Sequence, residues 1–575
     1  MEALGVSEIV NQILQQVNKS TQASAARTCR FWSCIALDWL WRDMESLCPL
    51  FQLLSPLEAH EREWFFSSNL LHTNWGRFDS YAGRIRSIAH YDRYEFRGLR
   101  LATSSLFDEI DTWRPTRKTL APLLRNVTNI TWTASNARTL PLVLHLISLS
   151  LTTLEISCAR GMTTACASLL NDLTQRNLSL VKFVLSADDS NLDYTPNLSA
   201  FLRSQKRLVT ASLPPFSATK EVVNALGELP SLKKYTGWSV VKYRMPVESG
   251  MCFSWEPGTF KILEDLAFHA HSLVDASRTL QGAHRSLRSL QLTCRPSFTN
   301  DGLLSLTSTL ASVHHSLNEI ALNLFAINIT NVSDPSGNSI SLCYILPLLQ
   351  CRGLSSVRLS HKRTLAYSED DIVTMAAAWP GMVVLELFAD PTTDVTCDMG
   401  QPLQSIHVFI REFPGLKRLA LFVNILTDTV PEVSKAGMSG LANLEVLDFG
   451  TSPPLHATNP RIQRSISLYL SSITTPGIDI SGRRSSCHVR AVATTEEENE
   501  EYEFRLGFWL DIGTRVELVH AGRKSMAEEI SELSLQNKAL SEKVRKLELL
   551  QEAPGRQLTS PPSTGPVVVP EGFEA

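Results

Sequence analysis

One pattern of apolar and polar positions recurs along the middle of the chain: an apolar residue, two others, a second apolar residue, one other, and a third apolar residue. Its copies start at positions 127, 151, 180, 208, 232, 263, 287, 317, 354, 382, 416 and 444. The copies at 208 and 232 carry Ala211 and Gly237 at apolar positions. The mean step is about 29 residues. A single copy matches any buried strand, whereas twelve at a nearly constant step indicate an array of stacked repeats.

The last two apolar positions of each copy alternate with outward positions, which predicts a short strand. The segments between the copies, such as EDDIVTMAAAW at 369, are compatible with helices. One strand and one helix cannot bury an apolar face alone, but stacked neighbours share a continuous core. We therefore expect a curved α/β solenoid over residues 121–482, with its strands on the concave side. The pattern resembles the leucine-rich repeats of the ribonuclease-inhibitor-like or irregular F-box type, and the resemblance implies this fold.

The concave side of such an array is a natural surface for holding another protein. The fifth and seventh positions of the copies would place several large side chains there, and exposed aromatic residues and arginine are typical of binding hot spots. The candidate target-binding residues are Trp238, His269, Arg358, Glu386, Phe388 and Phe422. Glu386, Phe388 and Phe422 lie on adjacent repeats and form the preferred cluster. Taken singly, each is more often an ordinary surface or partly buried residue.

Residues 1–55 predict a small all-α module. Ile9, Ile13, Leu14 and Val17 form one apolar stripe, a second helix would contain Ala23, Ala26, Cys29 and Trp32, and a third segment contains Leu37, Leu40 and Trp41. Three helices of this total length bury too little apolar surface for stability on their own. The module is therefore either a docking unit covered by another protein or a cap on the larger domain. Residues 56–120 would follow as a helical connector, because Trp75, Phe78, Tyr81, Ile85 and Ile88 recur at three- and four-residue steps.

The last part of the chain changes character. An acidic run at 494–503 predicts a solvated linker, and a closing strand or helix would cap the array within 483–522. Residues 523–552 then predict a coiled-coil helix, with a heptad seam formed by Ile530, Leu533, Asn537, Leu540, Val544 and Leu547. β-Branched residues opposite leucines with a central asparagine favour a parallel two-stranded coiled coil, in which Lys543 faces Glu548 of the partner. The length is marginal, so a homodimer and a helix folded against the body are both open. Residues 553–575 predict a disordered tail.

Composition and motifs narrow the function. The chain of 575 residues is 43% hydrophobic with a net charge of -4, which gives no argument for nucleic acid or an anionic membrane. It has neither a signal-peptide pattern nor an apolar run of ~18 residues. Eleven scattered cysteines without a CxxC pair favour a reduced cytoplasmic or nuclear location. Phosphate-loop, HExxH and GxSxG motifs are absent, and the adjacent His314 and His315 diverge as a surface pair. We therefore expect no catalytic, cofactor or metal site, and no enzyme.

The segments EIVNQILQQV, ASAARTCRFW and ALDWLWRDM resemble, in order, the three parts of the F-box of fungal-type F-box proteins with leucine-rich repeats. The resemblance implies docking on a Skp-type adaptor and, through it, on a cullin ubiquitin ligase. By position it assigns the module's core and adaptor-facing surface to Ile9, Ile13, Leu14, Val17, Cys29, Trp32, Leu37, Leu40 and Trp41. The expected function is that of a non-catalytic substrate-recognition subunit that binds an unknown target protein on the repeats. A leucine-rich-repeat interaction scaffold outside any ligase is the alternative.

Overall fold

The fold comes from a computed structural model of the chain. It describes residues 6–91, 100–114, 122–187, 194–214, 219–237, 259–282, 286–297, 299–324, 339–361, 363–388, 401–424, 443–452, 459–482 and 496–551. Trp238 and the predicted tail 553–575 lie outside these residues. No helix in the described part of the chain is both long enough and apolar enough to cross a membrane.

The main feature is a parallel sheet in which the strands are paired in chain order. Its strands are β1 (Asp43–Met44), β4 (Ser87–Tyr91), β6 (Asn129–Ala134), β7 (Thr153–Cys158), β8 (Lys182–Ala187), β9 (Thr210–Ser212), β10 (Lys234–Thr236), β11 (Asp265–Ser272), β12 (Ser289–Ser297), β13 (Glu319–Leu324), β15 (Ser356–His361), β17 (Val384–Leu387), β19 (Arg418–Leu421), β21 (Val446–Asp448) and β22 (Asp479–Ser481). The middle apolar residue of each predicted copy is paired with that of the next, from Ile130 opposite Leu154 to Leu419 opposite Leu447. All twelve are buried, so the expected mixed α/β class with a large parallel sheet is confirmed.

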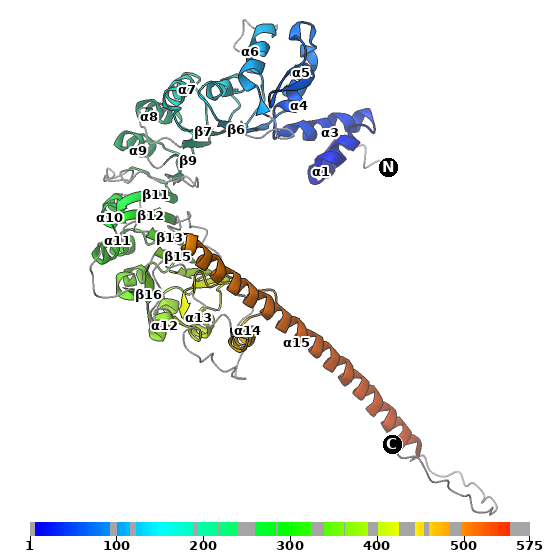
Figure 1. The fold of residues 1–575 in the computed structure, drawn as a ribbon, viewed down its shortest axis with the longest axis vertical. Helices are drawn as coiled ribbons and strands as arrows, with labels where there is room; N and C mark the ends of the chain where they lie inside the picture. The colour runs from blue at the N-terminus through cyan, green and yellow to red at the C-terminus, as the bar shows by residue number, and fades with distance from the viewer. Residues whose placement is uncertain are drawn as a thin grey trace, which may run out of the picture.

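Helices alternate with these strands and cover one side of the sheet. They are α7 (Thr163–Gln175), α8 (Thr195–Ser204), α9 (Lys220–Gly227), α10 (Leu273–Gln281), α11 (Asn300–Val313), α12 (Glu369–Ala378), α13 (Ser405–Glu412) and α14 (Pro460–Ile473), with 3-10 helices η3 (Leu140–His145), η5 (Leu342–Tyr344) and η6 (Leu346–Gln350). Figure 1 shows the helices along the convex side of a curved body and the strands along its concave side. Two small parallel pairs, β14 (Ser339–Ser341) with β16 (Thr364–Ala366) and β18 (Gln401–Pro402) with β20 (Val423–Asn424), supplement the sheet.

The predicted module is smaller than residues 1–55. Helices α1 (Ser7–Gln16), α2 (Lys19–Ala25) and α3 (Arg30–Arg42) share a small core that is separate from the main one. Met44, Leu47 and Phe51 belong instead to the core of the body, so the module ends at Arg42. The second predicted helix is also wrong in extent, because the chain turns after α2 and Cys29 caps α3, accepting a hydrogen bond from the Trp32 N–H.

The connector 56–120 is not purely helical. Besides η2 (Leu70–His72), α5 (Trp75–Ala82) and α6 (Thr103–Trp113), this region contains β4 and a small sheet of β2 (Leu57–His60), β3 (Glu63–Phe66) and β5 (Arg100–Leu101), and it is preceded by the short helix α4 (Cys48–Phe51). Helix α5 ends at Ala82, so the three- and four-residue steps stop there and Ile88 lies on β4. Because β1 pairs with β4 and β4 with β6, the main sheet begins next to the module.

The other end of the body is covered by α15 (Glu496–Gln551). Trp509, Ile512 and Val516 are fully buried, and the helix contacts β22 and α14. Gly513 permits this contact, because a Cβ atom there would lie 2.5 Å from the Ile480 carbonyl oxygen. The predicted closing element is therefore a helix. The prediction of a linker for the acidic run is wrong from Glu496 onward, since those residues form the first turns of the same helix.

Candidate functional site

Helix α1 has an apolar side that is only partly buried by the rest of the module. Val10 and Leu14 are buried in the module core and Val17 is packed against it. Ile9 and Ile13 form the adjoining stripe, because residues three and four apart share a side of a helix, and each is 38% exposed. An apolar surface that continues beyond the buried stripe is suited to contact with another protein.

The other residues assigned to this surface divide into two groups. Val17, Trp32, Leu37 and Leu40 are half-buried, and Cys29 is exposed at the start of α3. Trp41 packs against the core of the body, with its ring centroid 4.7 Å from that of Tyr81, so its assignment to the core of the module is wrong. Phe31 was not predicted, although it is 41% exposed on α3.

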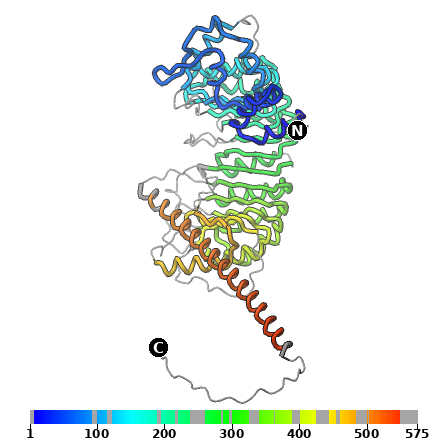
Figure 2. The backbone as a smooth tube through the Cα atoms, turned by 90° about the vertical axis from the view of Figure 1, so that its right-hand side faces the viewer, coloured from blue at the N-terminus to red at the C-terminus, as the bar shows by residue number. Residues whose placement is uncertain are grey.

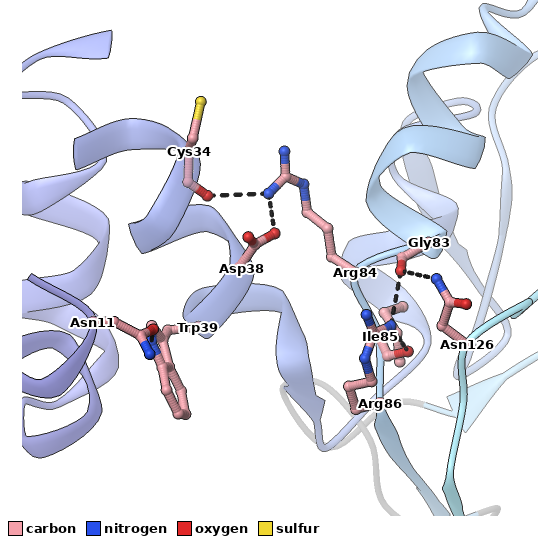
Figure 3. A network of polar contacts seen from close by, with 9 residues as sticks. All are labelled: Asn11, Cys34, Asp38, Trp39, Gly83, Arg84, Ile85, Arg86 and Asn126. Carbon is pink, nitrogen blue, oxygen red and sulfur yellow. Dashed lines mark hydrogen bonds and ion pairs between the residues drawn. The ribbon is translucent and has the colours of Figure 1, made fainter. Parts of the chain in front are cut away.

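The module is attached to the body by a short set of polar contacts (Figure 3). Arg84, which lies just before β4, forms an ion pair with Asp38 on α3 and donates a hydrogen bond to the Cys34 carbonyl over 3.1 Å. Within the module, the Trp39 indole N–H donates to Asn11 Oδ1 over 2.6 Å and joins α3 to α1.

The backbone adds a second attachment. Helix α3 ends at Arg42, and the next residue, Asp43, already begins β1. The Arg86 N–H donates to the Arg42 carbonyl over 2.8 Å, which extends the pairing of β1 with β4 to the end of the helix. With no linker between helix and sheet, the direction of the module relative to the concave face is fixed by the fold.

The predicted cluster on the concave side is not exposed. His269, Glu386, Phe388 and Phe422 are all buried, and only Arg358 keeps a substantial exposed fraction, 36% of its side chain. The alternation used for the prediction stops where β17 ends at Leu387, and Phe388 turns away with a φ of 47°. Phe422 likewise follows the last residue of β19. The prediction that these four residues are exposed on the concave surface is therefore wrong.

The buried carboxylate of Glu386 is compensated by two arginine side chains. Its carboxylate accepts a hydrogen bond from Arg418 Nε over 2.7 Å and lies 3.6 Å from Arg358 Nε. Arg418 also donates to Asp448 Oδ2 over 3.0 Å. The four side chains form an ionic row across β15, β17, β19 and β21, on the concave side. Each buried carboxylate in this row has a cationic partner, so we interpret the row as stabilising the array and not as a binding site.

One accessible part of the sheet face lies over the earlier strands. Its middle row, in register across β6 to β10, consists of half-exposed Thr131, Glu155, Val184, Ser212 and Thr236. Lys182 Nζ forms an ion pair with Glu155 over 2.6 Å on this surface. The sequence did not single out this row, because small side chains carry no hot-spot signal. It is a mostly polar surface on which short side chains leave the backbone of the sheet close to an approaching partner.

Features of catalytic chemistry are sparse in the described residues, where no three His, Cys, Asp or Glu side chains gather as metal ligands would. His314 is fully buried, so the prediction of a surface pair with His315 is wrong for it, and its Nε2 lies 3.1 Å from the Leu280 carbonyl oxygen. In comparisons with known proteins, no family model and no curated protein sequence matches the chain.

Burial makes His314 a source of acid sensitivity. Desolvation holds the pKa of His314 below its usual value, although the contact with the Leu280 carbonyl opposes the shift. An unfolded histidine takes up its proton near about pH 6.5, so the stabilisation is complete above that pH and is lost as the pH falls. The melting temperature of the wild type is expected to fall more between about pH 7.5 and about pH 5.5 than that of His314→Gln. Scanning fluorimetry at both pH values measures this, with the exposed His407→Gln as control, and equal falls in wild type and His314→Gln would contradict it.

Proposed function

We propose that this chain is the non-catalytic substrate-recognition subunit of a Skp–cullin–F-box ubiquitin ligase, acting in the cytoplasm or nucleus. The observation that supports this most is the half-covered apolar sector of α1. Ile9 and Ile13 continue the stripe that forms the module core, yet no other part of the described chain buries them. A small helical module with such an exposed stripe could dock on a Skp-type adaptor, as the sequence resemblance implies.

The second element of the proposal is the accessible sheet face over β6 to β10, which would bind the target protein. Figure 1 shows the module at the N-terminal end of the array, projecting on the concave side. Helix α3 passes directly into β1, and Arg84 contacts α3. These connections fix the distance and orientation between the α1 surface and the sheet face. A receptor of this kind raises the effective concentration of the target next to an enzyme held elsewhere in the assembly, and needs no catalytic groups of its own.

The full chain, co-expressed with a Skp-type adaptor, is expected to purify as a stoichiometric complex. Ile9→Glu combined with Ile13→Glu should reduce adaptor affinity by a factor of about 100 or more, since two charges would have to be desolvated in an apolar contact. The matched control is Gln15→Glu, which adds charge to an exposed polar position on the other side of the same helix. Calorimetric titration gives the affinities, and circular dichroism verifies that each variant is folded.

A wild-type chain that purifies alone and folded would contradict the ligase proposal and favour the interaction scaffold. Equal affinity of the double variant and the control would contradict the assignment of the surface to α1. Deletion of residues 1–54 is a poor test, because it would remove Leu47, Leu50 and Phe51 from the main core.

A further inference from the structure

The distal part of α15 presents an apolar stripe to solvent. Met526, Ile530, Leu533, Leu540, Val544 and Leu547 are each at least 52% exposed. Every described residue from 521 to 548 is exposed, so the helix is not folded against the body here, and that alternative from the sequence is wrong. Figures 1 and 2 both show this part of α15 extending past the array. An isolated helix with an uncovered apolar stripe is marginally stable in water.

The same heptad frame extends N-terminally along α15 to Trp509. The side chains at its core positions are buried or half-buried before Arg523 and exposed after it. Trp509, Ile512 and Val516 occupy the core positions of the proximal heptads, and the body buries them. The Arg523 guanidinium donates to the Ser471 carbonyl over 2.7 Å, and the described residues that follow it, from 524 to 548, are all exposed. The heptad frame is therefore continuous, although Arg523 takes a core position between Val516 and Ile530. The apolar residues before Arg523 are covered by this chain, and those after it are open.

The two halves of the stripe point in different directions. An α-helix drifts by about 20° per heptad relative to a seven-residue repeat, and four heptads separate Trp509 from Asn537, so the open half is rotated by about 80° from the side that faces the body. A second helix lying along the open half would therefore approach beside the body, with no need to pass through it.

We propose that the occupant of this stripe is the same stripe of a second copy of the chain, in a parallel two-stranded coiled coil. Ile530 and Val544 at one core position and leucines at the other favour two strands. Asn537 at the central core position pairs best with Asn537 of a second copy, which fixes the parallel orientation and the register.

The flanking charges agree with this pairing. In the parallel register the flanking positions place Glu529 opposite Ser534, Gln536 opposite Ser541 and Lys543 opposite Glu548 across the interface. None of these is a like-charge pair, and the last is an attractive one. Because each body lies about a quarter turn from the seam, a two-fold axis along the coiled coil puts the two bodies on opposite sides of it. The dimer would present two N-terminal modules and two sheet faces, which adds avidity toward a partner with repeated binding sites.

Light scattering on the full chain tests the proposal. The wild type is expected to have the mass of two chains at tens of micromolar, and Leu533→Asp combined with Leu540→Asp the mass of one. The matched control is Leu535→Asp, which changes an equally exposed leucine on the opposite side of the helix and should leave the dimer intact. Near-ultraviolet circular dichroism reports whether the buried tryptophans, Trp509 among them, remain packed in each variant.

A disulfide test checks the orientation. Under mild oxidation Asn537→Cys is expected to cross-link two chains, because residue 537 faces itself only in the parallel register, whereas Leu535→Cys should give no more cross-linking than the wild type. A wild-type monomer would overturn the proposal and leave the stripe for a different protein. A dimer that survives the paired Asp substitutions would overturn it too, and a dimer without the Asn537→Cys cross-link would overturn the parallel arrangement.

Discussion

Arg418→Ala is expected to lower the free energy of unfolding by about 3 kcal/mol, since removing one partner of a buried ion pair leaves the other charge uncompensated. Arg418 connects two carboxylates that are almost completely buried, Glu386 at 4% and Asp448 at 1% exposure. The loss is partly limited, because Arg358 remains near Glu386 and the Gly450 N–H still donates to Asp448. Urea denaturation followed by far-ultraviolet circular dichroism gives the free energy.

The neighbouring residue provides the control for this prediction. Lys417 forms an ion pair of similar length with Glu445, but both side chains are more than half exposed. Exposed pairs contribute about 0–1 kcal/mol, so Lys417→Ala should have a small effect. Arg418→Lys should lie between the two, because an ammonium group keeps the charge but lacks the planar fork that reaches both carboxylates. Similar values for Arg418→Ala and Lys417→Ala would show that the ionic row does not stabilise the array.

The sequence predicted the inward side of the array well. Twelve copies of one short pattern located the buried middle residue of every strand of the main sheet from β6 to β21, including the degenerate copies at Ala211 and Tyr235. The reason is physical: the pattern records which positions must be apolar for stacked repeats to share a core. Three strands at the ends of the sheet, β1, β4 and β22, fall outside the twelve copies of the pattern and were not predicted.

The outward side was predicted poorly, for equally physical reasons. Alternation along a strand gives the direction of a side chain only as far as the strand extends, and β17 stops one residue before Phe388. Burial of Glu386 depends on Arg418 from a strand 32 residues later, which no local pattern contains. The adjoining positions of Ile9 and Ile13 were predicted correctly, because both lie on one helix, where the spacing alone places them side by side.

Trp509→Ala is expected to cost about 3–5 kcal/mol at the C-terminal end of the array, as large-to-small changes of buried tryptophan do. The indole is fully buried, its ring centroid lies 4.0 Å from that of Phe449, and its N–H donates to the Ser452 carbonyl over 3.1 Å. No other described residue joins α15 to the body by both a stacked ring and a hydrogen bond. Stability in a repeat array is the sum of local terms, so the loss should appear where the cap lies.

Hydrogen exchange measures that locality. In Trp509→Ala the amides that connect the last strands, such as the Asp479 N–H bonded to the Glu445 carbonyl, should exchange much faster, while those joining β6 to β7 keep their wild-type rates. Leu510→Ala is the matched control, because the next side chain along the helix is 64% exposed and contributes little to packing. Equal acceleration at both ends of the array would mean that it unfolds as one unit. In that case α15 would stabilise the whole body, and any change in the pairing of its distal half would be felt at the N-terminal module.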